Sequence, residues 1–165
     1  MSEAYLIALG SNMRVPGVGG PRKVLPAAFA ALDQAGLRIA ARSPVIESAP
    51  IGPSLRRYAN AACVVSAPLA PREMLEMLQS IERSFGRNQN QRRGQRWRAR
   101  ALDLDIVMWS GGAWNDGVLT IPHRLFRERD FVLGPCARVA GDWRDPLSGL
   151  SVRQLFVRLS RPVSR

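Results

Sequence analysis

The sequence predicts an α+β protein in which an antiparallel sheet carries helices packed on its faces. Two segments with helical periodicity separate runs of apolar residues that are typical of strands. The predicted order is β-α-β-β-α-β, followed by a C-terminal extension, and this order is typical of a ferredoxin-like sandwich. A chain of 165 residues has room for one domain with a sizeable core, so we expect a single domain over residues 1–165.

The first half of the chain supplies one helix and three strands of this order. Residues 4–9 form an apolar run that ends at Gly10-Ser11-Asn12, and residues 21–34 are predicted to form a helix. Pro21 suits the first turn of that helix. Residues 37–48 and 58–67 are the next strand candidates, and the Pro- and Gly-rich segment between them excludes regular structure.

The second half begins with the clearest helix, residues 71–85. Met74, Leu78 and Ile81 recur at helical spacing, and Gly86 stands where a left-handed cap is expected. The last strand of the core begins at Asp103. Glycine-rich turn sequences predict a hairpin over residues 110–122, and short helices with a basic tail complete the chain.

The strand that begins at Asp103 carries two acids at its start. Asp103 and Asp105 are two positions apart, so their side chains point to one face while Leu104 points to the other. Their Cα atoms are expected about 6.5 Å apart, twice the rise per residue. Carboxylates at this spacing can hold one or two divalent cations. A solvated strand face is the simpler interpretation of an Asp-x-Asp pattern taken alone.

An arginine-rich segment precedes these acids. It is interrupted by Gly86 and Gly94 and offers no helical face. Cationic side chains that lead into two metal-binding acids suit phosphoryl transfer, which depends on positioning and on neutralising phosphate charge. The same arginines would also serve nucleic-acid binding, so both interpretations stay open on these residues alone. The arginines are Arg83, Arg87, Arg92, Arg93, Arg96, Arg98 and Arg100.

The composition limits the setting and the partners. A formal net charge of +11 predicts attraction to polyanions without choosing among nucleotides, nucleic acids and acidic membranes. Cys63 and Cys136 stand apart from other metal-ligating residues, which argues against structural zinc and a disulfide scaffold and fits a reducing cytoplasm. No segment approaches the ~20 apolar residues of a membrane span. We therefore expect a cytoplasmic protein with no membrane partner.

Other polar residues carry little information by themselves. His123 is the only histidine, and a single histidine is more often structural than catalytic. Tyr58 and Asn60 share one face of a predicted strand, which alone indicates packing plus a hydrogen bond. The glycines before Pro21 are not followed by the Lys-Ser/Thr pair of a Walker motif.

Six segments taken together resemble one family. They are ALGSN at 8–12, SAPIGP at 48–53, YANA at 58–61, IERSFGR at 81–87, RWRARALDLDI at 96–106 and IPHRLFRERDFVL at 121–133. In this order they resemble 6-hydroxymethyl-7,8-dihydropterin pyrophosphokinase of folate synthesis. The resemblance implies a ferredoxin-like fold. It also implies transfer of pyrophosphate from MgATP to the hydroxymethyl group of the pterin, with release of AMP.

The same resemblance implies roles for individual residues. Asp103 and Asp105 would bind two magnesium ions, and Arg87 and Arg100 would assist transfer. The implied substrate-binding residues are Gly10, Ser48, Ile51, Tyr58, Asn60, Trp97 and Phe131, with Tyr58 and Phe131 on either side of the pterin ring. The implied nucleotide-binding residues are Gln79, Glu82, Arg96, Ile106, Leu119, Thr120, His123 and Arg129.

Two other functions compete with this expectation. A basic RNA-binding module on the same fold would use the arginines for phosphates and sheet aromatics for bases, although the second and third predicted strands offer little beyond Tyr58. A metal-dependent nuclease would use the two acids. We expect the pyrophosphokinase, acting as a monomer on ATP and the pterin with no nucleic-acid partner.

Overall fold

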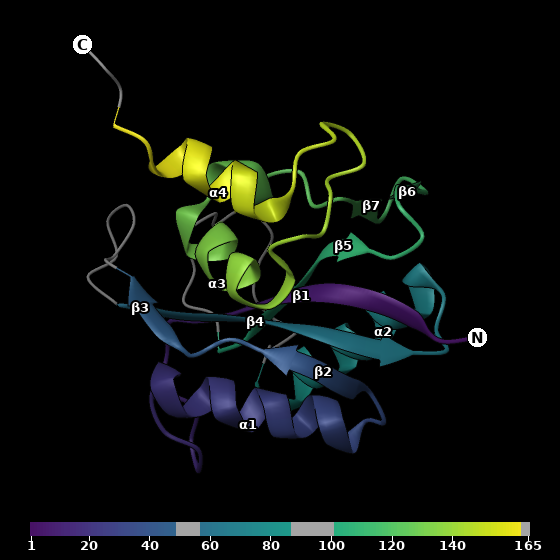
Figure 1. Cartoon of the computed structure of the whole chain (residues 1–165). Coiled ribbons are helices and arrows are strands. Elements are labelled where there is room, and N and C mark those ends of the chain that lie inside the picture. Colours follow the sequence, from purple (N-terminus) through teal and green to yellow (C-terminus); the bar gives the residue numbers. More distant parts are fainter. Residues whose placement is uncertain (49–56, 87–100, 163–165) are drawn as a thin grey trace.

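The computed structural model describes residues 1–48, 57–86 and 101–162 (Figure 1). Its main sheet has five strands: β1 (Glu3–Ser11), β2 (Arg38–Arg42), β3 (Ile46–Ser48), β4 (Tyr58–Ala67) and β5 (Asp103–Trp109). The helices are α1 (Pro21–Gln34), α2 (Pro71–Ser84), α3 (Asp130–Ala140) and α4 (Val152–Ser160). A short 3-10 helix, η1 (Phe126–Glu128), precedes α3, and β6 (Trp114–Asn115) pairs with β7 (Thr120–Ile121).

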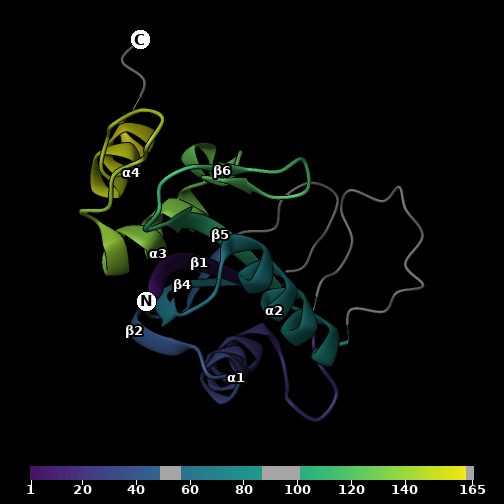
Figure 2. The ribbon, with the colours of Figure 1, turned by 90° about the vertical axis from the view of Figure 1, so that its right-hand side faces the viewer.

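The sheet lies between two helical layers, with α1 and α2 on one face and α3 and α4 on the other (Figure 1 and Figure 2). Its strands follow the order β2-β4-β1-β5, and β3 pairs with β4 beyond the end of β2. Every pairing in this sheet is antiparallel. The predicted α+β architecture, an antiparallel sheet with packed helices, is therefore confirmed.

Both helices of the first layer begin at the predicted proline. Proline suits a first turn because the missing N–H would have no intrahelical partner there. At α2, Glu73 Oε1 also accepts the Ala70 N–H at 3.0 Å, which satisfies one donor at the helix start. Gly86 follows α2 with φ +93, the left-handed conformation predicted for a cap.

The single strand predicted over residues 37–48 is wrong, because the segment forms β2 and β3 with a break between them. Ser43 fills the break by exchanging hydrogen bonds with Ala62, its N–H donating to the carbonyl at 2.8 Å and its Oγ accepting the amide at 2.9 Å. Pro44 follows and has no N–H for a ladder. The first strand is also longer than predicted and continues through Gly10 to Ser11.

Alternate side chains of β1 pack into two separate hydrophobic cores. Tyr5, Ile7 and Leu9 pack in the cluster shared with α1 and α2, whereas Leu6 and Ala8 pack in the cluster shared with α3 and α4. Gly10 is next in the second series, so it lies on the α3 face of the sheet. The α3 face of the sheet therefore carries no side chain at this position of β1.

The hairpin predicted within residues 110–122 is present as β6 and β7. Asp116 organises its turn, because Oδ1 accepts the amides of Val118 at 3.0 Å and Leu119 at 2.9 Å. Arg72 Nη1 of α2 donates to Asp116 Oδ2 at 3.0 Å and ties the hairpin to the helix. None of the helices in the described part of the chain is long and apolar enough to cross a membrane.

Candidate functional site

Three predicted site residues form a row across neighbouring strands. Gly10 of β1 is the register partner of Asn60 on β4 and of Asp103 on β5. Directly opposed residues share a face, so this polar row (Asn60, Gly10 and Asp103) lies on the α3 face. Asp105, two residues along β5, is paired with Ala8 and extends the same face.

The two acids have the exposure that their spacing predicts. Asp103 is half-buried and Asp105 is exposed, while Leu104 between them is only 4% exposed and packs in the core with α1 and α2. The expectation that both carboxylates share one face is thus confirmed.

This pair fits a magnesium site that a substrate completes. Within residues 1–48, 57–86 and 101–162, no cluster of three or more His, Cys, Asp or Glu could hold a metal by itself. Magnesium in nucleotide sites takes one or two carboxylates, and water and phosphate oxygens supply the other ligands. Asp103 and Asp105 match that donor set.

Asn60 is held in a fixed orientation at the opposite end of the polar row from Asp103. Its side chain is 5% exposed, and Nδ2 donates to Ser48 Oγ at 3.0 Å. Its Oδ1 lies 3.4 Å from the point where a Cβ on Gly10 would stand. Ser48 is the register partner of Tyr58, so three residues of the predicted pterin site lie together at the junction of β3 and β4.

The start of α3 brings a cation and an aromatic ring together. The Arg129 guanidinium carbon lies 5.8 Å from the centre of the Phe131 ring. Burial lowers the pKa of His123, Asp105 opposes that shift, and Arg129 adds to it. His123, which precedes η1, thus lies within electrostatic range of Asp105 of β5 and of Arg129.

The other described residues assigned to nucleotide binding differ in how exposed their side chains are. Gln79 is half-buried on α2, where Glu82 is a buried carboxylate with 4% exposure. Ile106 is 4% exposed and Leu119 is 8% exposed, and both belong to the core with α1 and α2. We therefore expect these two to contact a ligand through the backbone. Thr120 of β7 is half-buried. The predicted roles of Ile51, Arg87, Arg96, Trp97 and Arg100 fall outside the described residues.

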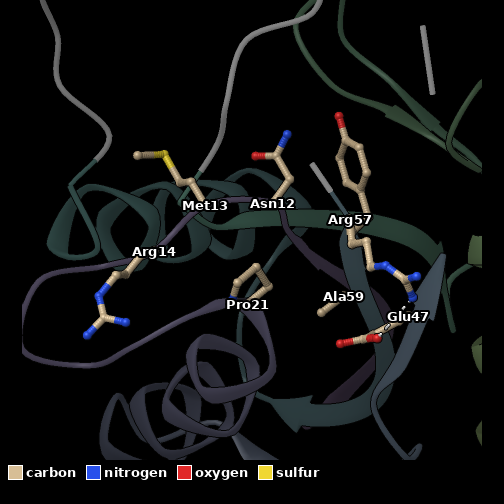
Figure 3. Close-up of a pocket in the computed structure, with 8 residues that line it drawn as sticks. Asn12, Met13, Arg14, Pro21, Glu47, Arg57 and Ala59 are labelled. Atoms are coloured by element: carbon tan, nitrogen blue, oxygen red, sulfur yellow. Dashed lines mark ion pairs between the residues drawn. The ribbon is translucent and has the colours of Figure 1, made fainter. Parts of the chain in front are cut away.

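Sequence reasoning missed a pocket of about 550 Å³ beside this site (Figure 3). Glu47 and Arg57 point toward each other on one side of it, with Arg57 Nη1 3.7 Å from Glu47 Oε2. Glu47 Oε1 also lies 3.7 Å from Arg22 Nε. Glu47 is opposite Ala59 in register, so the pocket opens on the α1 side of the sheet. Its described lining consists of Asn12, Met13, Arg14, Pro21, Glu47, Arg57, Tyr58 and Ala59.

Sequence reasoning also missed the pairing of Arg127 with Asp145. Arg127 Nε donates to Asp145 Oδ2 at 2.6 Å. The two residues are 18 positions apart, and no periodic pattern connects them.

The chain matches a family model and named relatives. Residues 6–141 match the model described as 7,8-dihydro-6-hydroxymethylpterin-pyrophosphokinase (HPPK). A 2-amino-4-hydroxy-6-hydroxymethyldihydropteridine pyrophosphokinase of Methylorubrum extorquens is 35% identical, over 96% of this chain and 94% of the relative. The protein of that name from Synechocystis sp. is 37% identical over 74% of this chain and 60% of the relative.

Solved structures with a similar fold include Plasmodium falciparum HPPK-DHPS. One, the A437G variant with STZ-DHP, superposes with a TM-score of 0.73 at 12% identity and covers 96% of this chain and 45% of that chain. The wild type with pteroate gives a TM-score of 0.69 at 13% identity, covering 96% and 42%. The chain thus spans less than half of these Plasmodium chains. At such low identity the likeness concerns the fold alone.

Proposed function

The chain belongs to the 7,8-dihydro-6-hydroxymethylpterin-pyrophosphokinase family, and we propose that it transfers the β,γ-pyrophosphoryl group of ATP to the hydroxymethyl group of 6-hydroxymethyl-7,8-dihydropterin. AMP and the pterin diphosphate are the products, and the reaction serves folate biosynthesis. The observation that carries the proposal is the polar row, with the Asn60 amide at one end and Asp103, followed by Asp105, at the other.

The acid end of the row is the phosphate side of the proposed site. Asp103 and Asp105 would hold two magnesium ions, which, when bound, neutralise phosphate charge and align the reacting groups. Arg129 adds a cation to this side of the site, since it and Asp105 both act electrostatically on the pKa of His123. Gln79, Glu82, Ile106, Leu119, Thr120 and His123 are the other described residues assigned to ATP, and Arg87, Arg96 and Arg100 complete the assignment by resemblance.

The amide end of the row is the pterin side. Tyr58 and Phe131 supply two aromatic side chains that stack on the flat ring. Asn60 forms hydrogen bonds with the polar edge of the ring, and Ser48 fixes the direction in which the Asn60 amide points. A buried amide without its substrate partner costs free energy, so this end selects against rings with the wrong edge. Gly10 keeps the space between the two ends open, and Ile51 and Trp97 are assigned here by resemblance.

Several finer assignments belong to the same proposal. We class the fold as a ferredoxin-like sandwich, which is supported by two interleaved β-α-β halves, β1-α1-β2 and β4-α2-β5. We also propose one domain over residues 1–165, a monomer in the cytoplasm, and no nucleic-acid or membrane partner. The comparisons support neither the RNA-binding module nor the nuclease as an alternative.

A nucleotide assay tests the proposed reaction. The purified protein should release AMP from ATP only when magnesium and 6-hydroxymethyl-7,8-dihydropterin are both present. Omission of the pterin and chelation of the metal are the controls, with nucleotides separated by chromatography. Formation of ADP, or release of AMP at the same rate without pterin, would overturn the proposal.

A further inference from the structure

An ion pair between a half-buried arginine and a fully buried aspartate links the C-terminal part of the chain to the segment that carries Arg129 and Phe131. Asp145 lies in the connection between α3 and α4, and its side chain is 0% exposed. Arg127 of η1 donates from Nε to Oδ2 at 2.6 Å and from Nη2 to Oδ1 at 2.7 Å. Two such parallel bonds fix the orientation of both groups as well as their distance.

The connection between α3 and α4 holds Asp145 firmly. Ser148 Oγ donates to Asp145 Oδ2 at 2.7 Å, and the Leu147 N–H donates to Oδ1 at 3.1 Å. The Asp145 N–H donates to the Leu150 carbonyl at 2.9 Å, and its carbonyl accepts the Gly149 N–H at 2.8 Å. Burial by itself would raise the pKa of Asp145, but hydrogen bonds, with that from Arg127 foremost, lower it to about 2. The carboxylate therefore stays charged at neutral pH.

On the other side of the pair, Arg127 is part of the turn that starts α3. Its guanidinium lies 4.6 Å from the ring centre of Phe126, which is fully buried. The Phe126 carbonyl accepts the Arg129 N–H at 3.4 Å, and the Arg129 carbonyl accepts the Leu133 N–H at 2.9 Å. A shift of Arg127 would therefore move η1 and with it the first turn of α3.

We propose that Asp145 is a positioning residue, which acts through Arg127 to orient Arg129 and Phe131 for ATP and pterin. The inference rests on the proposed function, since that function makes Arg129 and Phe131 substrate contacts. Asp145 lies beyond residues 6–141, the part that the family model matches. The C-terminal segment of this chain thus serves substrate binding without touching either substrate.

Asp145→Asn tests this role because it removes the charge with almost no change in volume. We expect KM for both substrates to rise roughly tenfold, since small misplacements of binding groups are costly, while kcat changes less than KM. Asp142→Asn is the matched control. It breaks an exposed pair with Arg153, 2.5 Å in length, in the same part of the chain and should leave KM unchanged.

A double variant separates positioning from general loss of stability. In an Arg127→Met background, Asp145→Asn should raise KM no further, because the Arg127 guanidinium through which Asp145 acts on the site is already absent. A lower melting temperature with unchanged KM in Asp145→Asn would overturn the proposal. A further KM increase in the double variant equal to that in the single variant would also overturn it.

Amide hydrogen exchange gives a readout that needs no turnover. In Asp145→Asn, exchange should accelerate at least about tenfold more in peptides over residues 126–133 than in peptides of β4, which report global unfolding. An acceleration in 126–133 no greater than that in β4 would contradict the proposal. If the wild type releases no AMP, the proposed function fails, and the exchange result still decides whether Asp145 orients η1 and α3.

Discussion

The Asn60 side-chain amide donates a 3.0 Å hydrogen bond to Ser48 Oγ and so joins the start of β4 to the end of β3. Because Asn60 is 5% exposed, its amide has little freedom to turn. The proposed pterin site therefore offers a hydrogen-bonding group whose direction is set before the substrate arrives.

Asn60→Ala should weaken pterin binding by about 1 to 3 kcal/mol, because a polar ring edge would be left unpaired. ATP affinity should change little. Ser48→Ala keeps the Asn60 amide but removes the hydrogen bond that orients it. We therefore expect a smaller loss of affinity for the pterin. Calorimetry with each ligand separately checks both variants. An ATP affinity that falls while pterin affinity is unchanged would show that the amide end of the polar row does not bind the pterin.

Gly10→Ala should reduce activity without reducing stability. The added Cβ would meet Asn60 Oδ1 at 3.4 Å, an ordinary contact, and alanine loses less backbone entropy on folding than glycine. The methyl group would nevertheless stand between the Asn60 and Asp103 ends of the polar row. KM for the pterin should rise severalfold while the melting temperature holds.

Gly20→Ala is the control for this change, since its Cβ would meet nothing within 4 Å. It should leave KM for the pterin unchanged. A Gly10→Ala enzyme with the pterin KM of the wild type would show that the middle of the row is not substrate space.

Asp103→Asn and Asp105→Asn should each lower AMP release by about a hundredfold or more, if each carboxylate supports a metal worth several kcal/mol. In Asp105→Asn, which removes an exposed carboxylate, stability should hold or rise slightly, because two like charges on one strand face repel each other. Steady-state kinetics over a magnesium series, with melting temperatures alongside, checks both statements. Asp33→Asn, which removes an exposed carboxylate of α1, should behave as wild type. Near-normal turnover of both strand variants at limiting magnesium would remove the metal assignment.

Local patterns predicted the elements that position the site. The helix from Pro21 to Gln34 and the strand from Tyr58 to Ala67 have the predicted bounds, because proline starts and apolar periodicity are local properties. The shared face of Asp103 and Asp105 followed from strand geometry in the same way. The break at Ser43 was missed, although Pro44 was visible in the sequence, because apolar residues continue on both sides of it.

Contacts between distant segments could not be predicted by such patterns. The register that sets Gly10 between Asn60 and Asp103 depends on how three strands pair. The bond from Arg127 to Asp145 depends on the path of the chain between α3 and α4. Resemblance to a family supplied the roles of Asn60 and Phe131, but it gave no role to Asp145.

Acid should remove a stabilising contribution of Asp145. Its pKa in the folded protein is about 2, below the ordinary value of 3.8, so the unfolded chain takes up this proton first as the pH falls. The contribution is fully present above about pH 5 and is lost as the pH approaches 2. Wild type should exceed Asp145→Asn in unfolding free energy by ~2 kcal/mol at pH 7. The difference should shrink near pH 2.

Urea titrations of both proteins between pH 2 and pH 7 measure this difference. Asp116 also has a lowered pKa, from backbone hydrogen bonding by Leu119 and a side-chain bond from Arg72, but it is present in both proteins and cancels. A difference in unfolding free energy that is independent of pH would contradict the assigned role of the Arg127 bond in holding Asp145 charged.

Tracing the two terminal phosphates of ATP tests pyrophosphoryl transfer most directly. ATP labelled at the β-phosphorus and, in a parallel reaction, at the γ-phosphorus is incubated with the protein, magnesium and 6-hydroxymethyl-7,8-dihydropterin, and the products are separated. The proposed reaction predicts that both labels appear in the pterin product and that AMP carries neither. A pterin product that carries the γ label alone, or labels recovered only as free phosphate or pyrophosphate, would contradict it.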